Sequence, residues 1–369
     1  MSDNREDMAK KLRVGIIFGG RNSEHEVSLL SAASVLKAID RRKFEVVPIG
    51  INKAGHWLTS GAAQGLLEGS AAAALTHGEA AALDSHAALG GQSLDVVFPV
   101  LHGAFGEDGT IQGLFELAGM AYVGSGVLGS AAGMDKDVMK RLFANAKLPM
   151  VTHVTLLRAE WEGAPKKAIA RAEAALKYPV FVKPANAGSS VGISKAPNRK
   201  ELKAALDLAA KYDRKLLVEQ GVGGKKNKAR EFEVAVLGND DPKASVVGEI
   251  IPGKEFYDYE DKYLSAGAIP VVPARLSKAE TKQIQEMAIA AFRACDLAGL
   301  ARVDFLMEPE GKRRIFLNEV NTMPGFTNIS MYPKLWEATG LSYKELITRL
   351  IELALERHAE KSRTVYSRE

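Results

Sequence analysis

The sequence predicts an α/β protein that is divided into two or three domains. Its 369 residues exceed the usual size of a single domain. With 46% hydrophobic and 25% charged residues, the composition is that of a globular protein with buried cores rather than of a disordered chain. Short apolar runs alternate with helical patterns from the N-terminus onward, which is typical of a sheet covered by helices.

The first third of the chain predicts a parallel α/β domain. Gly19-Gly20 end the first apolar strand, and a helical pattern follows them. The stretch from Ser60 to Ser93 is rich in Ala and Gly, shows weak periodicity and is expected to be surface elaboration. The expected elements are a strand at 13–18, a helix at 27–39, strands at 44–51 and 96–101, and a helix at 110–118.

The rest of the chain predicts two further domains. The glycine-rich segment 124–134 marks the first boundary, an α+β pattern follows it, and strands dominate from Glu231. The expected domains are 1–124, 125–228 and 229–369. Strands are expected at 151–157, 180–183, 231–237, 245–251, 301–307 and 313–320, and helices at 135–146, 166–176, 200–211, 278–296 and 343–357.

Composition and charge exclude several classes of protein. The formal net charge of +4 is small for this length, so nucleic-acid binding is not expected. The one cysteine, Cys295, cannot form an internal disulfide and is expected to be a buried small hydrophobic residue, and no Cys/His cluster has zinc-ligand spacing. Segment 1–11 lacks the apolar core of a secretion signal, and no apolar run could span a bilayer. We therefore expect a cytoplasmic protein without membrane contact.

The last two predicted strands place oxygen ligands on one face of a sheet. If Glu310-Gly311 form a two-residue turn, Arg302 lies opposite Glu319. Two carboxylates and an amide oxygen on one face suit magnesium, which takes its other ligands from water and substrate phosphates. The alternative is a structural ion-pair cluster, which is costly to bury unless it binds something. The residues of this face are Arg302, Asp304, which lies one diagonal step away, Glu319 and Asn321.

A second candidate site follows the strand that ends at Lys183. The segment 181–193 runs from this strand into a glycine and serine loop, whose N–H and hydroxyl groups can donate to phosphate oxygens. The segment lacks the GxxxxGK[ST] spacing of the P-loop, so a nucleotide here would be bound by another architecture.

A dinucleotide site is a weaker alternative. Gly124, Gly126 and Gly129 match GxGxxG after a predicted strand. The dinucleotide fold also needs a parallel strand that ends in an acidic residue about 20 positions on, whereas here a helix bearing Asp135 follows. The missing strand disfavours a nicotinamide cofactor.

Two loops could contact substrate. Glu24 lies where the first strand turns into a helix, and there it could bind an ammonium group or simply complement the helix dipole together with Glu26. Local sequence leaves both interpretations open. The tyrosine-rich segment 252–269 could be a lid or a packed surface loop.

Taken in this order, the motifs resemble the D-alanine:D-alanine ligases of the ATP-grasp superfamily, from about Val14 to Leu353. Several widely spaced matches make a chance resemblance negligible. The matching segments are GGRNSEHEVS at 19–28, LHGAFGEDGTIQG at 101–113, GSGVLGSAAGMDK at 124–136, VKPANAGSSVGI at 182–193, FYDYEDKY at 256–263, ARVDF at 301–305 and NEVNTMPGFTNISMYP at 318–333.

The resemblance implies an ATP-grasp fold with ATP between the central and C-terminal domains. It implies a ligase that joins two D-alanine molecules through D-alanyl phosphate, for peptidoglycan synthesis. The ATP-binding positions would be Lys136 and Lys183 on the phosphates, Glu219 on the adenine side, Val222 at the hinge, Glu231 on the ribose, and Phe256 and Lys262 of the possible lid. Asp304, Glu319 and Asn321 align with the ligands of two Mg²⁺ or Mn²⁺ ions.

The resemblance also implies roles for substrate residues. Glu24 would hold the ammonium group of the first D-alanine, tied to Ser189 and Tyr263, with His102 nearby. The remaining assignments are Arg302 and the Gly325 backbone at the oxyanion, and Ser330 and Met331 in the pocket of the second D-alanine.

Some features remain open after this comparison. Segment 223–228 is more basic and longer than the family pattern, and 62–92 has no match in it. Tyr263 favours an amine acceptor, but a ligase that uses D-lactate or D-serine stays an alternative. A nicotinamide-dependent dehydrogenase and a non-catalytic nucleotide-binding module are the other hypotheses. Relatives are commonly homodimers, so a homodimer is expected.

Overall fold

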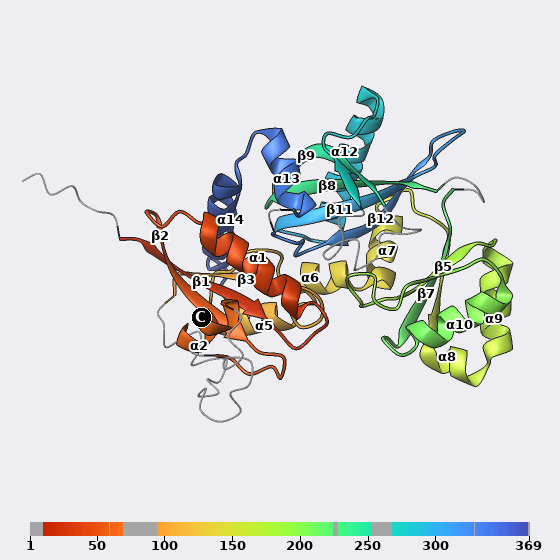
Figure 1. Cartoon of the computed structure of the whole chain (residues 1–369), viewed down its shortest axis with the longest axis horizontal. Coiled ribbons are helices and arrows are strands. Elements are labelled where there is room, and N and C mark those ends of the chain that lie inside the picture. Colours follow the sequence, from red (N-terminus) through yellow and green to blue (C-terminus); the bar gives the residue numbers. More distant parts are fainter. Residues whose placement is uncertain are drawn as a thin grey trace, which may run out of the picture.

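The computed structural model describes residues 10–58, 60–68, 94–223, 228–252, 268–327 and 329–367. These residues form three β-sheets with helices packed around them, and each sheet comes from one part of the sequence. In Figure 1 the N-terminal sheet lies to the left, the central sheet to the right and the C-terminal sheet above.

The N-terminal sheet is parallel, with strand order β2-β1-β3. Its middle strand is buried on both faces, which explains why its sequence is continuously apolar rather than alternating. The expected elements are all present, and their ends differ from the prediction by two residues or fewer. The elements are β1 (Leu12–Gly19), α1 (His25–Ala38), β2 (Phe44–Ile51), α2 (Ser60–Leu67), β3 (Val96–Val100) and α5 (Thr110–Leu117).

Helix α2 corrects one expectation about the stretch 60–93. Ala63 is fully buried, Leu66 is nearly so, and the helix packs on β2, where the side chain of Ala63 lies close to Gly50. The first part of this stretch therefore belongs to the core and is not surface elaboration. Residues 69–93 lie outside the described part of the chain.

Two consecutive helices, α6 and α7, lead from the N-terminal sheet to the central sheet (Figure 1). Asp135 begins α7, because its side chain accepts hydrogen bonds from the backbone N–H groups of Asp137 and Val138. The central sheet is antiparallel, with order β4-β7-β5-β6. The elements are α6 (Val127–Met134), α7 (Lys136–Asn145), β4 (His153–Leu157), α8 (Arg158–Gly163), α9 (Pro165–Ala175), β5 (Val180–Pro184), β6 (Ser194–Ala196), α10 (Arg199–Ala209) and β7 (Lys215–Gln220).

The C-terminal sheet is antiparallel, with order β10-β9-β8-β11-β12. Cys295 is buried at the end of α12, as expected, and burial raises the pKa of its thiol to about 12. The elements are β8 (Arg230–Gly238), β9 (Lys243–Ile251), β10 (Ile269–Val271), α12 (Lys278–Ala294), β11 (Gly299–Met307), β12 (Ile315–Asn321), α13 (Met331–Thr339) and α14 (Tyr343–Lys361).

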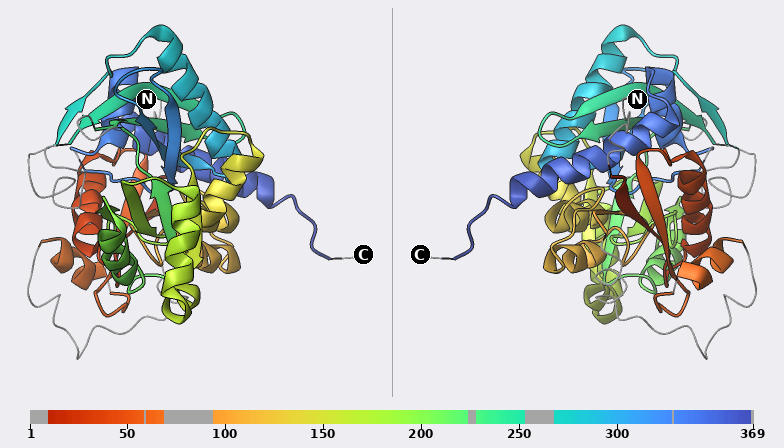
Figure 2. Two further views of the ribbon diagram at one scale, coloured as in Figure 1. Left: turned by 90° about the vertical axis from the view of Figure 1, so that its right-hand side faces the viewer. Right: turned by 90° about the vertical axis from the view of Figure 1, so that its left-hand side faces the viewer.

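The N-terminal and C-terminal sheets share one hydrophobic core. Helix α14 contacts β3 and α1 on one side and β8 and β11 on the other, so apolar residues of both sheets form one buried cluster around it. Figure 2 shows α14 running between the two sheets. The central sheet has a separate core, formed with α8, α9 and α10.

The pairing of β11 with β12 differs from the predicted register. Arg302 lies opposite Asn321, and Asp304 lies opposite Glu319. The predicted two-residue turn is wrong, because the Glu308 N–H already bonds the Arg314 carbonyl at 3.0 Å, and a bulge at Asn318 adds one residue to β12. Beyond the bulge the shift is two residues, so Arg302, Asp304, Glu319 and Asn321 keep their predicted face.

Candidate active site

One face of β11 and β12 carries the polar cluster that the sequence predicts. Arg302 donates to both oxygens of Asp304, with Nε to Oδ1 and Nη2 to Oδ2 each at 2.7 Å. The Asn321 amide also donates to Asp304 Oδ2, at 3.0 Å. On the neighbouring strand β8, Glu233 Oε2 lies 3.2 Å from Arg302 Nε, a contact that sequence reasoning missed. The two parallel hydrogen bonds from Arg302 to Asp304 fix the plane of the guanidinium group.

The donor atoms on this face suit a hard divalent cation. Asp304 and Glu319 offer carboxylate oxygens, and Asn321 keeps its carbonyl oxygen for another partner because its NH₂ group bonds Asp304. Within the described residues, no three His, Cys, Asp or Glu side chains are grouped so that they alone could hold a metal ion. A metal at this face would therefore also need the amide oxygen and oxygens from a bound ligand.

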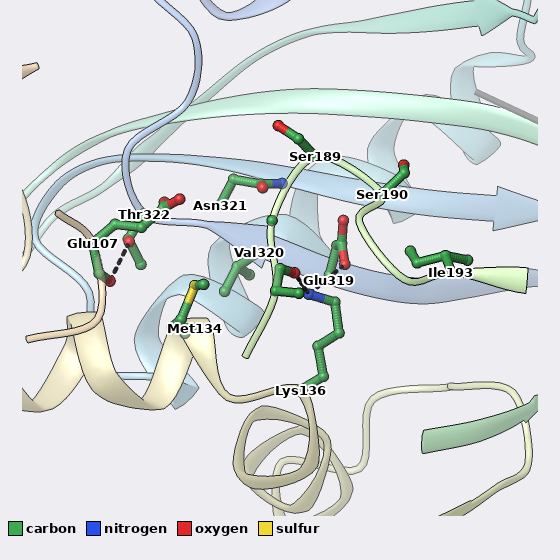
Figure 3. A pocket seen from close by; sticks show the side chains of 13 residues that line it. Glu107, Met134, Lys136, Ser189, Ser190, Ile193, Glu319, Val320, Asn321 and Thr322 are labelled. Carbon is green, nitrogen blue, oxygen red and sulfur yellow. Dashed lines mark hydrogen bonds and ion pairs between the residues drawn. The ribbon is translucent and has the colours of Figure 1, made fainter. Parts of the chain in front are cut away.

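Lys136 connects this face to a small cavity. Its Nζ lies 3.5 Å from Glu319 Oε2 and donates to the Ala187 carbonyl at 2.9 Å. The cavity has a volume of about 40 Å³, enough for about three water molecules. Figure 3 shows its lining, which comes from the start of α7, the 187–193 loop, the end of β12 and Glu107.

Two lysines, Lys140 and Lys183, share the buried carboxylate of Glu219. Glu219 Oε1 lies 2.7 Å from Lys140 Nζ, and Glu219 Oε2 lies 2.7 Å from Lys183 Nζ. Burial acts against the charge of Glu219, but the two lysines outweigh it and hold the pKa of this carboxyl well below its usual range. Burial likewise opposes the charge of Lys183, but the Glu219 and Glu319 carboxylates outweigh it and raise the pKa of Lys183. Lys183 is therefore positively charged.

The bulge on β12 supports this network. The Asn318 side-chain oxygen accepts from Lys183 Nζ at 3.2 Å, and its backbone carbonyl accepts from Lys140 Nζ at 3.3 Å. Asn318, the extra residue of β12, thus accepts a hydrogen bond from each of the two lysines.

The glycine and serine loop turns back toward the N-terminal sheet. Ser189 and Ser190 both have left-handed backbone angles, with φ of 46° and 61°, a conformation that costs free energy and is common at functional sites. The turn points the Ser189 hydroxyl at Glu24, to whose Oε1 it donates. A Cβ atom on Gly188 would lie 2.5 Å from Glu24 Oε2, so a larger residue here would displace the Glu24 carboxylate.

Glu24 is held where β1 turns into α1. Its side chain is only 5% exposed, and its N–H donates to Asn22 Oδ1 at 2.9 Å. The Asn22 amide donates to the carbonyls of His102 and Ala104, each at 2.7 Å, which ties this turn to the loop after β3. The structure thus brings Glu24 and Ser189 together, as the family resemblance implies.

His102 is buried between the N-terminal and C-terminal parts of the chain. Its Nδ1 donates to the Met323 carbonyl at 2.9 Å, so the neutral ring accepts at Nε2 from the Ser31 hydroxyl, at 3.1 Å. Burial lowers the pKa of this imidazole, which agrees with a neutral ring. Both ring nitrogens therefore have protein partners.

Glu107 is a cavity residue that sequence reasoning did not single out. Its carboxyl accepts the Gly103 N–H at 2.8 Å and the Met323 N–H at 3.3 Å. Burial and the nearby Glu24 charge raise its pKa to about 8. Its position in a GEDG turn gave no signal for this, since such turns are usually exposed.

The other predicted residues occupy varied positions. Glu231, on β8, lies close enough to Lys183 for its charge to help raise the pKa of that lysine, and Val222 follows the end of β7. Gly325 is buried, and Ser330 accepts the Thr327 N–H at 3.0 Å. Met331 packs into the shared core and does not line the cavity. Phe256, Lys262 and Tyr263 lie outside the described residues.

The GxGxxG glycines have a packing role. A Cβ atom on Gly129 would lie 2.3 Å from the Asp296 carbonyl oxygen, and Gly124 has φ of 101°. These positions let α6 approach the C-terminal sheet closely. Packing therefore accounts for the motif without a dinucleotide.

Two family models match most of the chain. The model described as "D-ala D-ala ligase N-terminus" matches residues 13–125, and "D-ala D-ala ligase C-terminus" matches residues 142–352. A D-alanine–D-alanine ligase of Heliobacterium modesticaldum is 50% identical over 97% of this chain and 98% of its own length. One from Bacillus cytotoxicus is 48% identical over 97% of this chain and 99% of its own length.

Solved structures show the same similarity. The D-alanine-D-alanine ligase from Coxiella burnetii has a TM-score of 0.77 and 36% identity, over 96% of this chain and 97% of that one. The VanG D-Ala:D-Ser ligase from Enterococcus faecalis has a TM-score of 0.77 and 36% identity, over 94% of this chain and all of that one. Within the described residues, no helix is both long and apolar enough to cross a membrane.

Proposed function

The chain belongs to the D-alanine–D-alanine ligase family, and we propose that the cavity between Glu24 and the β11–β12 face is its catalytic site. The enzyme condenses two D-alanine molecules with ATP, through D-alanyl phosphate, and releases ADP and phosphate. One observation carries the assignment of the site. Glu24, Lys136 and the Arg302 cluster, which are far apart in sequence, converge on a single cavity region.

Glu24 is assigned to the ammonium group of the first D-alanine. Its carboxylate is buried against Gly103 and Gly188, and Ser189 orients it by donating to Oε1. Tyr263 is assigned to the same group of residues, and His102, through its bonds to Ser31 and Met323, keeps the loop after β3 in place. The close approach of Gly103 and Gly188 to this carboxylate favours a small amino acid.

The lysines are assigned to the ATP phosphates. Lys183 is held charged by Glu219, and Lys136 lies at the start of α7, so both can offset negative charge there. Glu219, Val222, Glu231, Phe256 and Lys262 are assigned to the rest of the nucleotide, which would lie between the central and C-terminal sheets.

Asp304, Glu319 and Asn321 would hold two Mg²⁺ or Mn²⁺ ions. When bound, such ions neutralise phosphate charge and orient the transferred group. The protein's part is mainly positioning, since phosphoryl transfer needs no protein nucleophile.

Arg302 is assigned to the oxyanion that forms when the second amine attacks the acyl phosphate. Its guanidinium is already oriented by Asp304 and Glu233, so little reorganisation is needed during the reaction. The Gly325 backbone is assigned to the same oxygen. Ser330 and Met331 are assigned to the second D-alanine, and the 252–269 segment to a lid that keeps water from the acyl phosphate.

The finer organisation is proposed in the same way. Domain boundaries at 1–124, 125–228 and 229–369 are supported by the separate sheets and by the N-terminal family model, which ends at residue 125. A homodimer is proposed only because relatives are commonly homodimers. We assign the reaction to the cytoplasm because ATP is a substrate.

Phosphate release with ATP, Mg²⁺ and D-alanine tests the function, with L-alanine as the control. Phosphate release is expected with D-alanine but not with L-alanine. Folded protein that releases no phosphate with D-alanine would overturn the assignment. D-serine is a second acceptor worth testing, because one similar structure is a D-Ala:D-Ser ligase. Mass spectrometry of products from mixtures of D-alanine, D-serine and D-lactate distinguishes these acceptors, and D-alanyl-D-alanine is expected to dominate.

A further inference from the structure

Glu107 joins two loops that come from opposite ends of the chain. One oxygen of its carboxyl accepts the Gly103 N–H in the loop after β3, and the other accepts the Met323 N–H in the segment after β12. Glu107 is only 9% exposed and lines the cavity of Figure 3. One side chain thus spans a sequence separation of more than 200 residues.

Two further bonds connect the same loops. The His102 ring donates to the Met323 carbonyl at 2.9 Å, and the Thr322 hydroxyl donates to the Glu107 carbonyl at 3.4 Å. Met323 is therefore held on both its N–H and its carbonyl group. The backbone before Gly325 has little freedom relative to the loop after β3.

Gly103 transmits this arrangement to Glu24. A Cβ atom on Gly103 would lie 2.4 Å from Glu24 Oε2, so the carboxylate of Glu24 packs directly against this backbone. The N–H of the same residue is bonded to Glu107. Any shift of Glu107 would therefore change the distance between Glu24 and the 322–326 segment.

The arrangement argues against two other roles for Glu107, that of a general base and that of a purely structural link between the two loops. Both of its oxygens already accept backbone N–H groups, so it is poorly placed to take a proton from substrate. A residue that only joined the two loops would not need to be acidic, since burying a carboxyl so near the charge of Glu24 is costly.

We propose that Glu107 is a positioning residue. It holds the 322–326 segment at a fixed distance from Glu24, so that the ammonium group and the carboxyl group of the first D-alanine are bound at the same time. The proposal rests on the proposed function, in which Glu24 holds the ammonium group and Gly325 lies at the reacting carboxyl. Misplacing such a segment by about 1 Å can slow a reaction about a hundredfold.

Glu107→Gln tests the proposal, because the amide keeps the size of the side chain but turns a donor toward one of the two N–H groups. We expect kcat to fall about ten- to a hundredfold while KM for ATP stays within about twofold of the wild type. Glu107→Asp keeps two acceptors on a shorter side chain and is expected to lose less activity.

Trp161→Phe is the matched control. It removes one hydrogen bond, from Trp161 Nε1 to Asp207 at 3.0 Å, among the outer helices of the central sheet. It is expected to lower stability and leave kcat unchanged. If Glu107→Gln matches this control in kcat, the proposal is wrong.

Hydrogen exchange measured by mass spectrometry gives a readout that does not depend on activity. In Glu107→Gln, peptides covering 322–326 should exchange about fivefold faster or more, while peptides from α14 stay unchanged. Unchanged exchange at 322–326 would overturn the proposal even if kcat falls. An inactive wild type would overturn the proposed function, and the exchange measurement would still decide whether Glu107 holds the segment.

Discussion

Replacing Lys140 with Met should destabilise the protein strongly, although Lys140 has no direct role in the proposed reaction. Its side chain is 1% exposed, its Nζ lies 2.7 Å from Glu219 and it also donates to the Asn318 carbonyl. Met preserves the length of the side chain but removes the charge and the donor. Glu219 then keeps only Lys183.

The expected loss in the free energy of unfolding depends on how many charged partners the remaining buried groups keep. Removing one partner of a buried ion pair costs about 3–5 kcal/mol when the other charge is left alone. Because Glu219 keeps Lys183, Lys140→Met should cost less, about 2–3 kcal/mol. Glu219→Gln removes the carboxylate that both lysines contact, leaves Lys183 only the charges of Glu319 and Glu231, and should cost more, up to about 5 kcal/mol.

Urea unfolding followed by circular dichroism measures these costs, provided that the m-value stays constant. The matched control is Lys282→Met on α12, whose lysine is 77% exposed and lies 3.7 Å from Glu286, so a loss below about 0.5 kcal/mol is expected. The double variant Lys140→Met with Glu219→Gln should cost less than the sum of the single variants, by about 1–3 kcal/mol. A cost for Lys140→Met equal to the control, or strict additivity in the double variant, would refute the reasoning.

Three further predictions concern the cavity. Gly188→Ala should raise KM for D-alanine at least about tenfold in phosphate-release assays, because its Cβ would lie 2.5 Å from Glu24 Oε2, whereas Gly163→Ala, with open space around it, should have no effect. Asp304→Asn should raise the Mg²⁺ concentration for half-maximal rate about tenfold or more, and an unchanged Mg²⁺ titration would remove it from the metal site. Burial and the Glu24 charge raise the pKa of Glu107 to about 8, above its value near 4.5 in the unfolded chain. The folded protein therefore favours the neutral form of Glu107, which contributes stability at low pH. This contribution is lost as the pH rises toward 8. Urea unfolding at several pH values should therefore show wild-type stability falling relative to Glu107→Gln over that range, and parallel curves would contradict the raised pKa.

Strand alternation was enough to place the polar face but not to set its register. Arg302, Asp304, Glu319 and Asn321 share a face because any even shift preserves side-chain parity. The bulge at Asn318 is held by tertiary contacts with Lys140 and Lys183, which no local pattern encodes.

The buried charges show a second limit of sequence reasoning. Lys140 and Arg141 are adjacent in one helix, yet the first side chain is 1% exposed and the second is 72% exposed. Nothing in their local sequence distinguishes them, because the burial of Lys140 comes from β7 and β12. Glu107 and Glu233 were missed for the same reason, since their partners lie on other strands and loops.

The shared core around α14 has a consequence for how the protein is made. A ribosome releases the chain from its N-terminus, so β1, β2 and β3 emerge early, whereas residues 343–361 emerge last. Because α14 covers apolar surface on β3 and α1, the first sheet has an incomplete core throughout synthesis of the two later sheets. Nascent chains would thus expose this surface until α14 has been synthesised, and a chain truncated before Tyr343 should be bound by chaperones rather than fold.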